Sequence, residues 1–419
     1  MTEAEQNVTA EQQGASTPPS TLTIKDYFYL RPEFDSFSFI PERDGAFLFG
    51  EKDQKIAQSL LGLIEDWGCS MEGPKGVLFG DYGRGKTHLC HHLCNQIPKQ
   101  SLPFLPYYCK LSAYKKKEPF SSFVGALIGA LGSDLKRVFE LYRDRHTAGT
   151  AKPVMGVHSD LARLVRDVNH WIGDDVHCNQ VIRYLSGDKV GGQDALSFVS
   201  KPQLTTTVEF GDVFRLIADL FLQVHTKLPL FLIDEVEYLK LISDNDTFHH
   251  WVAAFRELTE NRQLGILFCV GAVEQEQLPE ILTMPEIVRR IGTTNYLEFF
   301  FQSETEIRDF LVEFLGTLIA KGPVPQRHVD VFDSRPSDVV PAELQALTGG
   351  DTKQLKAFPF EPSALDHLCQ LLQAGGGTNK PSEALNRLQR LTQMAMRNST
   401  KIITKAMVDE LDDGGLTTF

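Results

Sequence analysis

Short, wholly apolar runs alternate along the chain with longer segments in which apolar residues recur at helical spacing. The apolar runs are GVLF (76–79), LPYYCKLS (105–112), PLFLIDE (229–235), LGILFCVGA (264–272) and NYLEFFF (295–301). The segments with helical spacing are IAQSLLGLIEDW (56–67), FSSFVGALIGALG (120–132), VFRLIADLFLQVH (213–225) and a polar stretch around 245–260. Wholly apolar strands need cover on both faces, so the pattern predicts an α/β fold with a parallel sheet between helices.

The same pattern predicts three parts of the chain. Residues 1–22 are polar and lack the apolar surface that offsets chain entropy, so we expect a disordered tail. The α/β core covers 23–301 and holds a long, mainly helical insertion at 133–206, with helical spacing at 159–172 and 181–187. From Ser303 onward the spacing is helical only, which predicts a C-terminal helical domain over 302–419.

An aromatic-rich stretch opens the predicted core between Tyr27 and Phe49. Clustered aromatic side chains either form part of a core or line a groove for a partner. The sequence leaves both interpretations open.

Composition narrows the class of protein. Lys and Arg number 42 against 55 Asp and Glu, a net charge of −13 with a pI near 5.4, which excludes a surface that is broadly basic toward nucleic acid. The seven Cys follow no disulfide framework, and no apolar stretch approaches the ~20 residues of a membrane span. The first residues also lack the basic and apolar regions of a signal peptide, so we expect a cytoplasmic protein without a membrane anchor.

The segment GDYGRGKT at 80–87 matches the phosphate-binding pattern G-x-x-x-x-G-K-[ST] and stands between an apolar run and a helix, as such a loop requires. Its glycines let the backbone N–H groups surround a β-phosphate, with the N-terminus of a helix behind them. Lys86 would contact the β- and γ-phosphates as a catalytic group, and Thr87 would ligate Mg²⁺. The predicted nucleotide-binding residues are Gly80, Asp81, Tyr82, Gly83, Arg84, Gly85, Lys86, Thr87 and His88.

A second motif, FLIDE at 231–235, is an apolar strand that ends in two acids. Beside the phosphate-binding loop, Asp234 would hold Mg²⁺ through water and Glu235 would polarise the attacking water as a general base. An acid that merely caps the strand end is the alternative. Together the two motifs predict binding and hydrolysis of ATP with Mg²⁺.

The order of these elements resembles the AAA+ ATPases, in particular the branch shared by origin-recognition proteins and signal-transduction ATPases. GEKDQKI (50–56) is similar to the G-R-x-x-E element of that family, DEVEYL (234–239) to its acidic motif, and the C-terminal helices to its lid, so the resemblance spans most of 48–412. It implies a three-layer P-loop NTPase core with a parallel sheet, a helical lid that closes over the nucleotide, and assembly into a ring or filament.

The resemblance also implies an arginine finger. Arg289 or Arg290, in EIVRRIG (286–292), occupies the place where AAA+ proteins keep an arginine that acts on the neighbouring subunit's γ-phosphate. The alternative is a surface salt bridge, and the sequence does not choose between the two arginines.

Two positions depart from the family pattern. The lid position that is usually Arg corresponds to Lys380, which would bind nucleotide through a single contact, with Arg387 further along the same helix. The strand at 264–272 lacks the Asn or Thr expected at its end, and the first polar side chains after it are Glu274 and Gln275. The residue that positions the attacking water is therefore not identified by the sequence.

A narrower resemblance concerns VIRYLSGD (181–188), which is followed by an amphipathic helix and the LIDEVEYL strand. This arrangement is similar to ATP-binding proteins of bacterial phage-defence systems of the BREX type.

A basic run, Lys115, Lys116 and Lys117, follows Lys110 and Tyr114 after the second strand. In ring-forming AAA+ proteins this loop faces the pore, where a basic loop with an aromatic could follow a phosphate backbone. A solvated loop that aids solubility is the other interpretation.

The helix after the phosphate-binding loop carries His88, Cys90, His91, His92 and Cys94. Residues four apart on one helix could share a metal ion, but no second pair follows at zinc-finger spacing. Packing of this helix against the sheet is the alternative, and it is the one that the sequence favours.

Taken together, the sequence predicts an oligomeric AAA+ ATPase that couples ATP turnover to remodelling or regulation of a nucleic-acid-associated complex, with a role in antiphage defence and a protein partner. The alternative is a nucleotide-gated signalling or scaffold ATPase that recruits a protein effector without contacting nucleic acid. A small-molecule kinase is disfavoured by the lid and arginine pattern.

Overall fold

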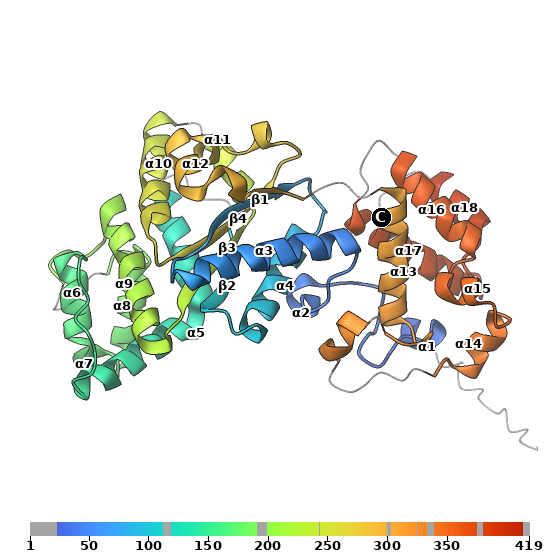
Figure 1. The fold of residues 1–419 in the computed structure, drawn as a ribbon, viewed down its shortest axis with the longest axis horizontal. Helices are drawn as coiled ribbons and strands as arrows, with labels where there is room; N and C mark the ends of the chain where they lie inside the picture. The colour runs from blue at the N-terminus through green and yellow to red at the C-terminus, as the bar shows by residue number, and fades with distance from the viewer. Residues whose placement is uncertain are drawn as a thin grey trace, which may run out of the picture.

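A five-stranded parallel sheet forms the centre of the N-terminal lobe in the computed structural model (Figure 1). The model describes residues 23–111, 119–190, 199–242, 244–299, 303–324, 326–332, 339–374 and 380–413. The strands are β1 (Lys75–Gly80), β2 (Phe104–Lys110), β3 (Leu228–Asp234), β4 (Gly265–Gly271) and β5 (Tyr296–Glu298). Their order is β2-β3-β4-β1-β5, so β4 lies between β3 and β1, and the carboxyl ends of all strands meet at one edge.

Successive side chains along each strand enter two different cores. On β3, Phe231 and Ile233 face one core while Leu230 and Leu232 face the other. The first core is covered by α5 (Pro119–Thr147), α9 (Thr207–His225), α10 (Asn245–Glu260) and α12 (Pro285–Ile291). The second is covered by α3 (Glu51–Cys69) and α4 (Lys86–Lys99). Cover on both faces explains why the strands are apolar without alternation.

The insertion extends the first layer of helices away from the sheet. It contains α6 (Ser159–Arg166), α7 (Val168–Trp171) and α8 (Asp175–Leu185), and the predicted single helix at 159–172 is interrupted at Asp167. Helix α5 is longer than predicted and kinks at Gly132, whose φ of 52° is non-helical. Buried Trp171 and Tyr184 belong to the same hydrophobic core as the sheet, so the insertion packs as part of the N-terminal lobe.

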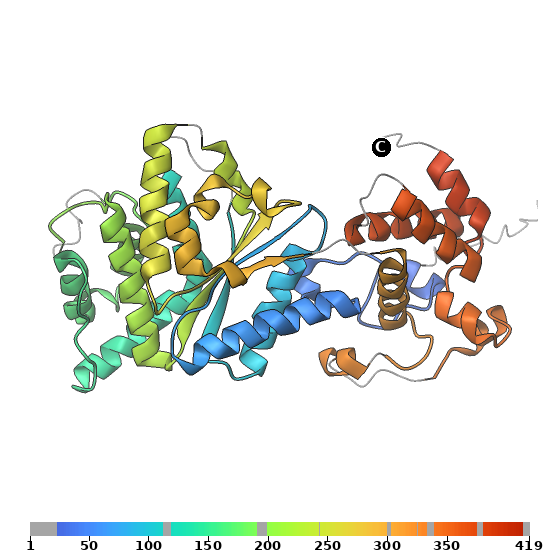
Figure 2. The same ribbon diagram turned by 45° about the horizontal axis from the view of Figure 1, so that its top comes forward.

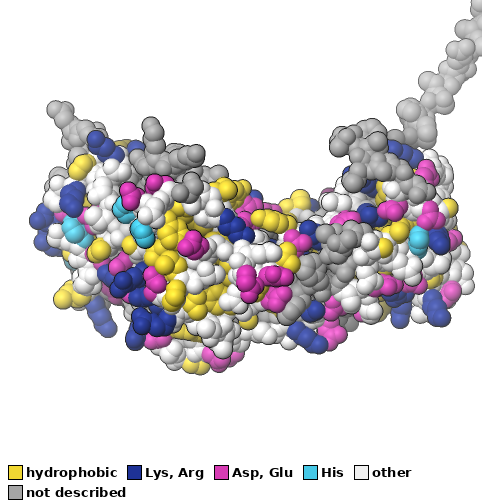
Figure 3. Space-filling view, turned by 90° about the horizontal axis from the view of Figure 1, so that it is seen from above, with side chains coloured by type: hydrophobic (Ala, Val, Ile, Leu, Met, Phe, Trp, Pro, Cys, Tyr) yellow, Lys and Arg dark blue, Asp and Glu magenta, His cyan; other side chains and the backbone are white. Residues whose placement is uncertain are grey.

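The C-terminal helices form a second lobe beside the carboxyl ends of the strands (Figures 1 and 2). The helices are α13 (Glu304–Leu318), α14 (Ala342–Leu347), α15 (Thr352–Ala357), α16 (Pro362–Ala374), α17 (Pro381–Arg397) and α18 (Lys405–Asp413). They bury a hydrophobic core of their own. Seen from above, the surface is hollowed between the two lobes (Figure 3).

The aromatic stretch before α3 packs on the C-terminal helices, although the sequence analysis placed it with the α/β core. It carries the short helices α1 (Ile24–Tyr27) and α2 (Pro41–Asp44), and its Phe side chains belong to the hydrophobic core of the second lobe. The guanidinium of Arg31, only 2% exposed, donates to the carbonyls of Thr317 and Gly322. These aromatics are therefore core residues, and the stretch places the first described residues in the same lobe as the C-terminal helices.

Short elements complete the connections between the main helices and strands. They are η1 (Val236–Leu241), η2 (Gln275–Gln277), α11 (Glu280–Thr283), η3 (Thr293–Asn295) and η4 (Gln326–Val331). Within the described ranges, no helix has both the length and the apolarity that a membrane span needs.

Candidate functional site

A cavity of about 670 Å³ lies at the carboxyl ends of the strands, between the sheet and the C-terminal helices. Its polar end is formed by the loop at 80–87 and by the residues that follow β3. Its apolar wall comes from three separate segments of the chain: Phe39, Leu48, Phe49, Phe310, Phe314 and Leu385. A cavity with one apolar and one charged end suits a ligand with an aromatic ring and phosphates.

The loop between β1 and α4 has the backbone that its glycines predict. Gly83 and Gly85 adopt φ values of 74° and 96°, which L side chains rarely adopt, and a Cβ at Gly85 would meet only open space. Gly85 also caps α4 without a side-chain hydrogen bond, so the N-terminus of this helix opens into the cavity. This arrangement fits an anion such as a phosphate.

Lys86 lies folded back into this loop. Its ammonium donates to the carbonyls of Gly80 and Asp81 at 2.8 and 2.9 Å. Burial lowers the pKa of Lys86, and the nearby carboxylate of Glu237 partly opposes that shift. A buried ammonium held only by carbonyls is ready to exchange them for phosphate oxygens.

The metal-binding residues predicted from the sequence lie in contact. The Thr87 hydroxyl donates to Asp234 Oδ2 at 2.5 Å, the Tyr108 hydroxyl donates to the same oxygen at 3.1 Å, and Asp234 is 3% exposed. Burial and Asp234 together raise the pKa of Tyr108, so this phenol remains a donor. A hydroxyl and a carboxylate oxygen at one point of a phosphate site are the donors that Mg²⁺ prefers, so the residues fit this ion.

Glu235 is held in an unusual conformation beside this point. Its φ of 59° places a non-glycine residue in the left-handed region, and its N–H donates to Asp234 Oδ1 at 2.9 Å. Its carboxylate forms an ion pair with Lys110 at the end of β2, with 2.8 Å between Nζ and Oε1. Such backbone conformations carry strain and cluster at functional sites.

The lid contacts the phosphate-binding loop directly. Lys380, at the N-cap of α17, lies 3.0 Å from Asp81 Oδ2, and the N–H of Ser382 donates to the carbonyl of Gly83 at 3.4 Å. Burial raises the pKa of Asp81, but the hydrogen bonds from Lys380 and Tyr82 outweigh it, and the net pKa is lowered. The carboxylate is therefore ionised beside the phosphate site.

Arg387, which the sequence placed further along the same helix, points elsewhere. Its guanidinium pairs with Glu383 at 3.3 Å and with Asp412 of α18 at 2.9 Å. It stabilises the lid and does not line the cavity.

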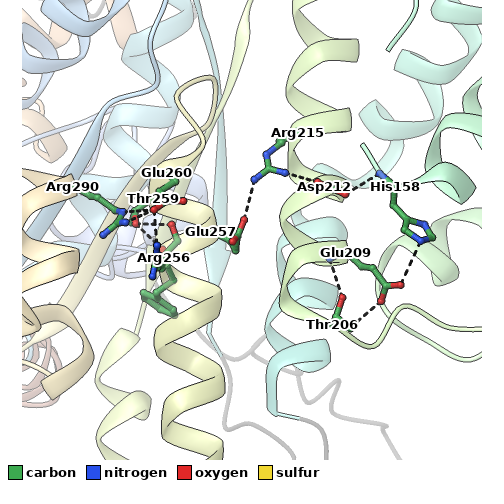
Figure 4. A network of polar contacts seen from close by, with 11 residues as sticks. His158, Thr206, Glu209, Asp212, Arg215, Arg256, Glu257, Thr259, Glu260 and Arg290 are labelled. Carbon is green, nitrogen blue, oxygen red and sulfur yellow. Dashed lines mark hydrogen bonds and ion pairs between the residues drawn. The ribbon is translucent and has the colours of Figure 1, made fainter. Parts of the chain in front are cut away.

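The two candidate finger arginines differ in their surroundings. Arg290 forms an ion pair with Glu260 of α10, which Arg256 also contacts (Figure 4). Arg290 also donates to the carbonyl of Glu286. Arg289, one residue earlier on α12, is exposed, and no hydrogen bond or ion pair is found for its side chain within the described residues. Neither arginine lines the cavity of its own chain.

Sequence reasoning missed two acidic residues that line the cavity, Asp53 of α3 and Glu237. Glu237, in η1 after β3, accepts a hydrogen bond at 2.8 Å from the N–H of Gly271, the last residue of β4. Glu274 and Gln275, the first polar residues after β4, are exposed and do not line the cavity. The signal available in the sequence was the second acid of DEVEYL, two residues after Glu235.

The histidines and cysteines of α4 serve packing in this structure. His88 lines the cavity, contacts Phe39 with 4.8 Å between ring centroids, and has a pKa lowered by burial, so it is neutral. The Cys90 and Cys269 sulfurs lie 3.2 Å apart in the buried core. Among the described residues, no group of three or more potential metal-ligating side chains is found. The basic run Lys115–Lys117, with Tyr114, lies outside the described residues.

Comparisons with known proteins identify similar structures but no similar sequences. No protein-family model matches the chain, and no curated protein matches it. Among solved structures, Cdc6p from Pyrobaculum aerophilum is 12% identical with a TM-score of 0.45, over 93% of this chain and 73% of that protein. The Aeropyrum pernix ORC1 protein in complex with DNA is 11% identical with a TM-score of 0.44, over 88% and 67%. Domain III of the Thermotoga maritima replication initiation protein DnaA is 12% identical with a TM-score of 0.39, over 92% and 98%.

The fold and the site define the class of protein. The strand order, the phosphate-binding loop after β1, the acidic pair after β3 and the helical lobe over the cavity are features of a P-loop NTPase core with a parallel sheet and a helical lid. The fold class predicted from the sequence, an α/β core with a parallel sheet followed by a C-terminal helical domain, is thus confirmed. The chain resembles AAA+ proteins of the origin-recognition branch, as the sequence predicts. The resemblance to BREX-type proteins stays a prediction.

Proposed function

We propose that this protein binds ATP with Mg²⁺ in the cavity between the sheet and the lid and hydrolyses it to ADP and phosphate. The observation that carries the proposal is the contact of Thr87 with Asp234 directly behind the glycine-rich loop. Glu235, the next residue, lines the same cavity and holds its carboxylate on Lys110. Three residues from two distant segments thus meet where the chemistry of phosphoryl transfer needs them.

The roles of the residues follow from their positions. The loop at 80–87 would hold the phosphates through its N–H groups, while Lys86 would exchange its carbonyl partners for β- and γ-phosphate oxygens. Thr87 and Asp234 would hold Mg²⁺, which neutralises the charge of the phosphates. Glu235 would leave Lys110 and take a proton from the attacking water. Lys380 would exchange Asp81 for a phosphate oxygen.

The base would occupy the apolar end of the cavity. Phe39 and Phe49 pack there against Phe310 and Phe314 of α13, with 5.3 to 6.0 Å between ring centroids, and form one continuous wall. The neutral ring of His88 contacts Phe39 and also lines the cavity. An aromatic wall favours a planar ring through stacking and burial. The nucleotide would therefore contact both lobes. The position of the lid relative to the sheet would then depend on whether a nucleotide is bound.

Assembly of several chains belongs to the same proposal. Hydrophobic side chains that are only half-buried belong to α10 and to the start of α12: Phe248, Val252 and Met284. Arg289 on α12 is an exposed cation for which no partner is found among the described residues. Half-buried apolar side chains and an exposed cation on these helices suit contact with another copy. Arg289 would then reach the γ-phosphate held by the neighbouring chain, in a ring or filament.

ATP turnover would drive a conformational change and not the conversion of a metabolite. We propose a nucleic-acid-associated complex in the cytoplasm as the target, contacted through Lys115–Lys117 together with a protein partner, and a role in antiphage defence. The basic run and the resemblance of residues 181–188 to BREX-type proteins support this part of the proposal.

The decisive experiment compares ATP hydrolysis by the full chain with that of Glu235→Gln. We expect phosphate release from ATP and Mg²⁺ by the wild type, and a loss of about 100-fold or more in the variant, with binding of a fluorescent ATP analogue retained. Glu274→Gln, an exposed acid outside the cavity, is the matched control and should hydrolyse ATP normally. Equal turnover by wild type and Glu235→Gln would show that the base is another residue.

A second experiment tests the nucleic-acid part. Neutralising Lys115, Lys116 and Lys117 together should abolish stimulation of the ATPase by nucleic acid and leave basal hydrolysis intact. If no nucleic acid stimulates the wild type, a scaffold ATPase that acts only through a protein effector becomes the better description.

A further inference from the structure

Three acids of the cavity come from one short segment, but they have different partners. Asp234 contacts Thr87, Glu235 is paired with Lys110, and Glu237 is bound to the N–H of Gly271. The third contact ties the segment after β3 to the end of β4. It therefore fixes a carboxylate at the strand end where the sequence provides no polar side chain.

The order of the strands places this carboxylate between the two halves of the site. Strand β4 lies between β3, which leads to Glu235, and β1, which leads to the phosphate-binding loop. A group fixed on the last residue of β4 therefore lies between the candidate base and the loop. Glu237 lines the same cavity as both of them.

The space above Gly271 is filled by two side chains. A Cβ at this position would come within 2.7 Å of Glu237 Oε1 and within 2.7 Å of the Tyr82 ring of the phosphate-binding loop. Glycine is thus the residue that allows both side chains to approach the strand end. The Lys86 ammonium also lies near Tyr82, with 5.8 Å between Nζ and the centre of the ring.

We propose that Glu237 is a further catalytic residue, which orients the attacking water together with Glu235. A carboxylate can only accept hydrogen bonds, so at this place it suits a water molecule and not a phosphate oxygen. One oxygen remains on the Gly271 N–H. The carboxylate also has the Tyr82 hydroxyl as a hydrogen-bond partner, and a further lone pair accepts one proton of the water. The inference rests on the proposed ATP hydrolysis and adds to it the residue that the end of β4 lacks.

In the hydrolysis step, Glu235 and Glu237 each interact with one proton of the attacking water. As the water oxygen attacks the γ-phosphorus, one of its protons passes to Glu235 and the other stays on oxygen, hydrogen-bonded to Glu237. The bond from the γ-phosphorus to the β–γ bridging oxygen breaks, and ADP leaves with that electron pair. The proton on Glu235 then returns to product or solvent.

The experiment measures kcat, KM and analogue binding for the full chain and four variants. Glu237→Gln keeps the size of the side chain. Its carbonyl oxygen can still accept from the Gly271 N–H, but its NH₂ group would face the water in place of a carboxylate oxygen. We expect kcat to fall about 100-fold, as for a reactant displaced by about 1 Å, with ATP-analogue binding unchanged or tighter. Glu237→Ala should also lose kcat. Glu274→Gln and Gln275→Ala are exposed controls and should leave kcat unchanged.

Gly271→Ala is a further variant, which keeps the carboxylate but displaces it together with the Tyr82 ring. It should lower kcat in the same direction while retaining the analogue, which would exclude a loss of fold as the cause. If Glu237→Gln and Glu237→Ala hydrolyse ATP at the wild-type kcat, or change only KM, the inference is wrong although ATP hydrolysis stands. If the wild type itself releases no phosphate, the proposed function fails instead.

Discussion

Lys110 and Glu235 form an ion pair, with 2.8 Å between Nζ and Oε1, that joins the ends of neighbouring strands β2 and β3. The pair is accessible, since the Lys110 side chain is 59% and the Glu235 side chain 30% exposed. The hydrogen bond and charge of Glu235 raise the pKa of Lys110, so the ammonium stays charged. The candidate base is thus restrained by a cation that it must leave in order to act on water.

We predict that Lys110→Ala increases basal ATP hydrolysis. Exposed ion pairs contribute up to about 1 kcal/mol, so release of Glu235 should raise kcat by no more than about fivefold. Raising the salt concentration should have a similar effect on the wild type and little on the variant, because salt screens the pair. Steady-state phosphate release at low and high salt provides the measurement. A fall in kcat would instead show that Lys110 supports the active position of Glu235.

The contact between Asp81 and Lys380 predicts opposite effects for its two partners. Lys380→Ala removes the lid's cation from the phosphate site and should weaken ATP binding about tenfold, in the range of a charged hydrogen bond. Asp81→Asn removes a carboxylate beside the phosphates and frees Lys380, so it should strengthen binding. Titration with a fluorescent ATP analogue measures both. Lys401→Ala, a lid lysine that contacts Tyr29 far from the cavity, is the control. Equal weakening by Lys380→Ala and Lys401→Ala would assign the effect to lid stability.

The buried amine of Lys75 predicts how stability depends on pH. Lys75, at the start of β1, is 3% exposed and donates to the carbonyls of Gly73, Asn261 and Leu264, and burial lowers its pKa from 10.5 to about 7. Between these values the unfolded chain binds more protons than the folded one, so this group makes folding more favourable as pH rises from about 7 to about 10.5. The slope is at most about 1.4 kcal/mol per pH unit.

Denaturant unfolding of the wild type and Lys75→Met between pH 6.5 and 9.5 tests this prediction. The free energy of unfolding of the wild type, minus that of Lys75→Met, should increase with pH. Lys321, whose pKa burial also lowers to about 7, is retained in both proteins, so its contribution cancels. A constant difference would show that Lys75 stays protonated when buried.

Local patterns along the chain were enough to predict the sheet and the glycine-rich loop between β1 and α4. The strands β1, β3 and β4 are buried along their whole length, and the conformation of the glycine loop follows from the positive φ values of its own glycines. Both features are therefore determined by residues close together in the sequence. The role of the aromatic stretch could not be decided in this way. Its Phe side chains pack on helices almost 300 residues later, and Arg31 finds its acceptors at Thr317 and Gly322.

The residue opposite the end of β4 escaped prediction for a related reason. Glu274 and Gln275, the first polar side chains after residue 272, are exposed. The carboxylate bound there comes from Glu237, in the segment after the neighbouring strand. Only the strand order, with β4 between β3 and β1, brings the two together.

The surroundings of α12 separate the two candidate finger residues. Arg290 is bound to Glu260 (Figure 4) and to the carbonyl of Glu286. Arg290→Ala should therefore destabilise the fold by about 1 kcal/mol and leave part of the ATPase intact. Arg289 is exposed, so Arg289→Ala should keep its stability and ATP binding but lose hydrolysis about 1,000-fold if it acts on a neighbouring chain. Thermal unfolding and phosphate release measure the two effects.

Mixing inactive chains tests whether the site is shared. A chain with Arg289→Ala keeps Glu235, and a chain with Glu235→Gln keeps Arg289, so an interface between them contains one complete site. With random assembly at equal amounts, hydrolysis should return to about a quarter of the wild-type rate in a head-to-tail ring. Glu274→Gln chains mixed with Arg289→Ala chains control for dilution of the wild-type site. A mixture that assembles but stays as inactive as its components would exclude Arg289 as a residue acting across the interface, and recovery with Arg290→Ala in its place would assign that role to Arg290.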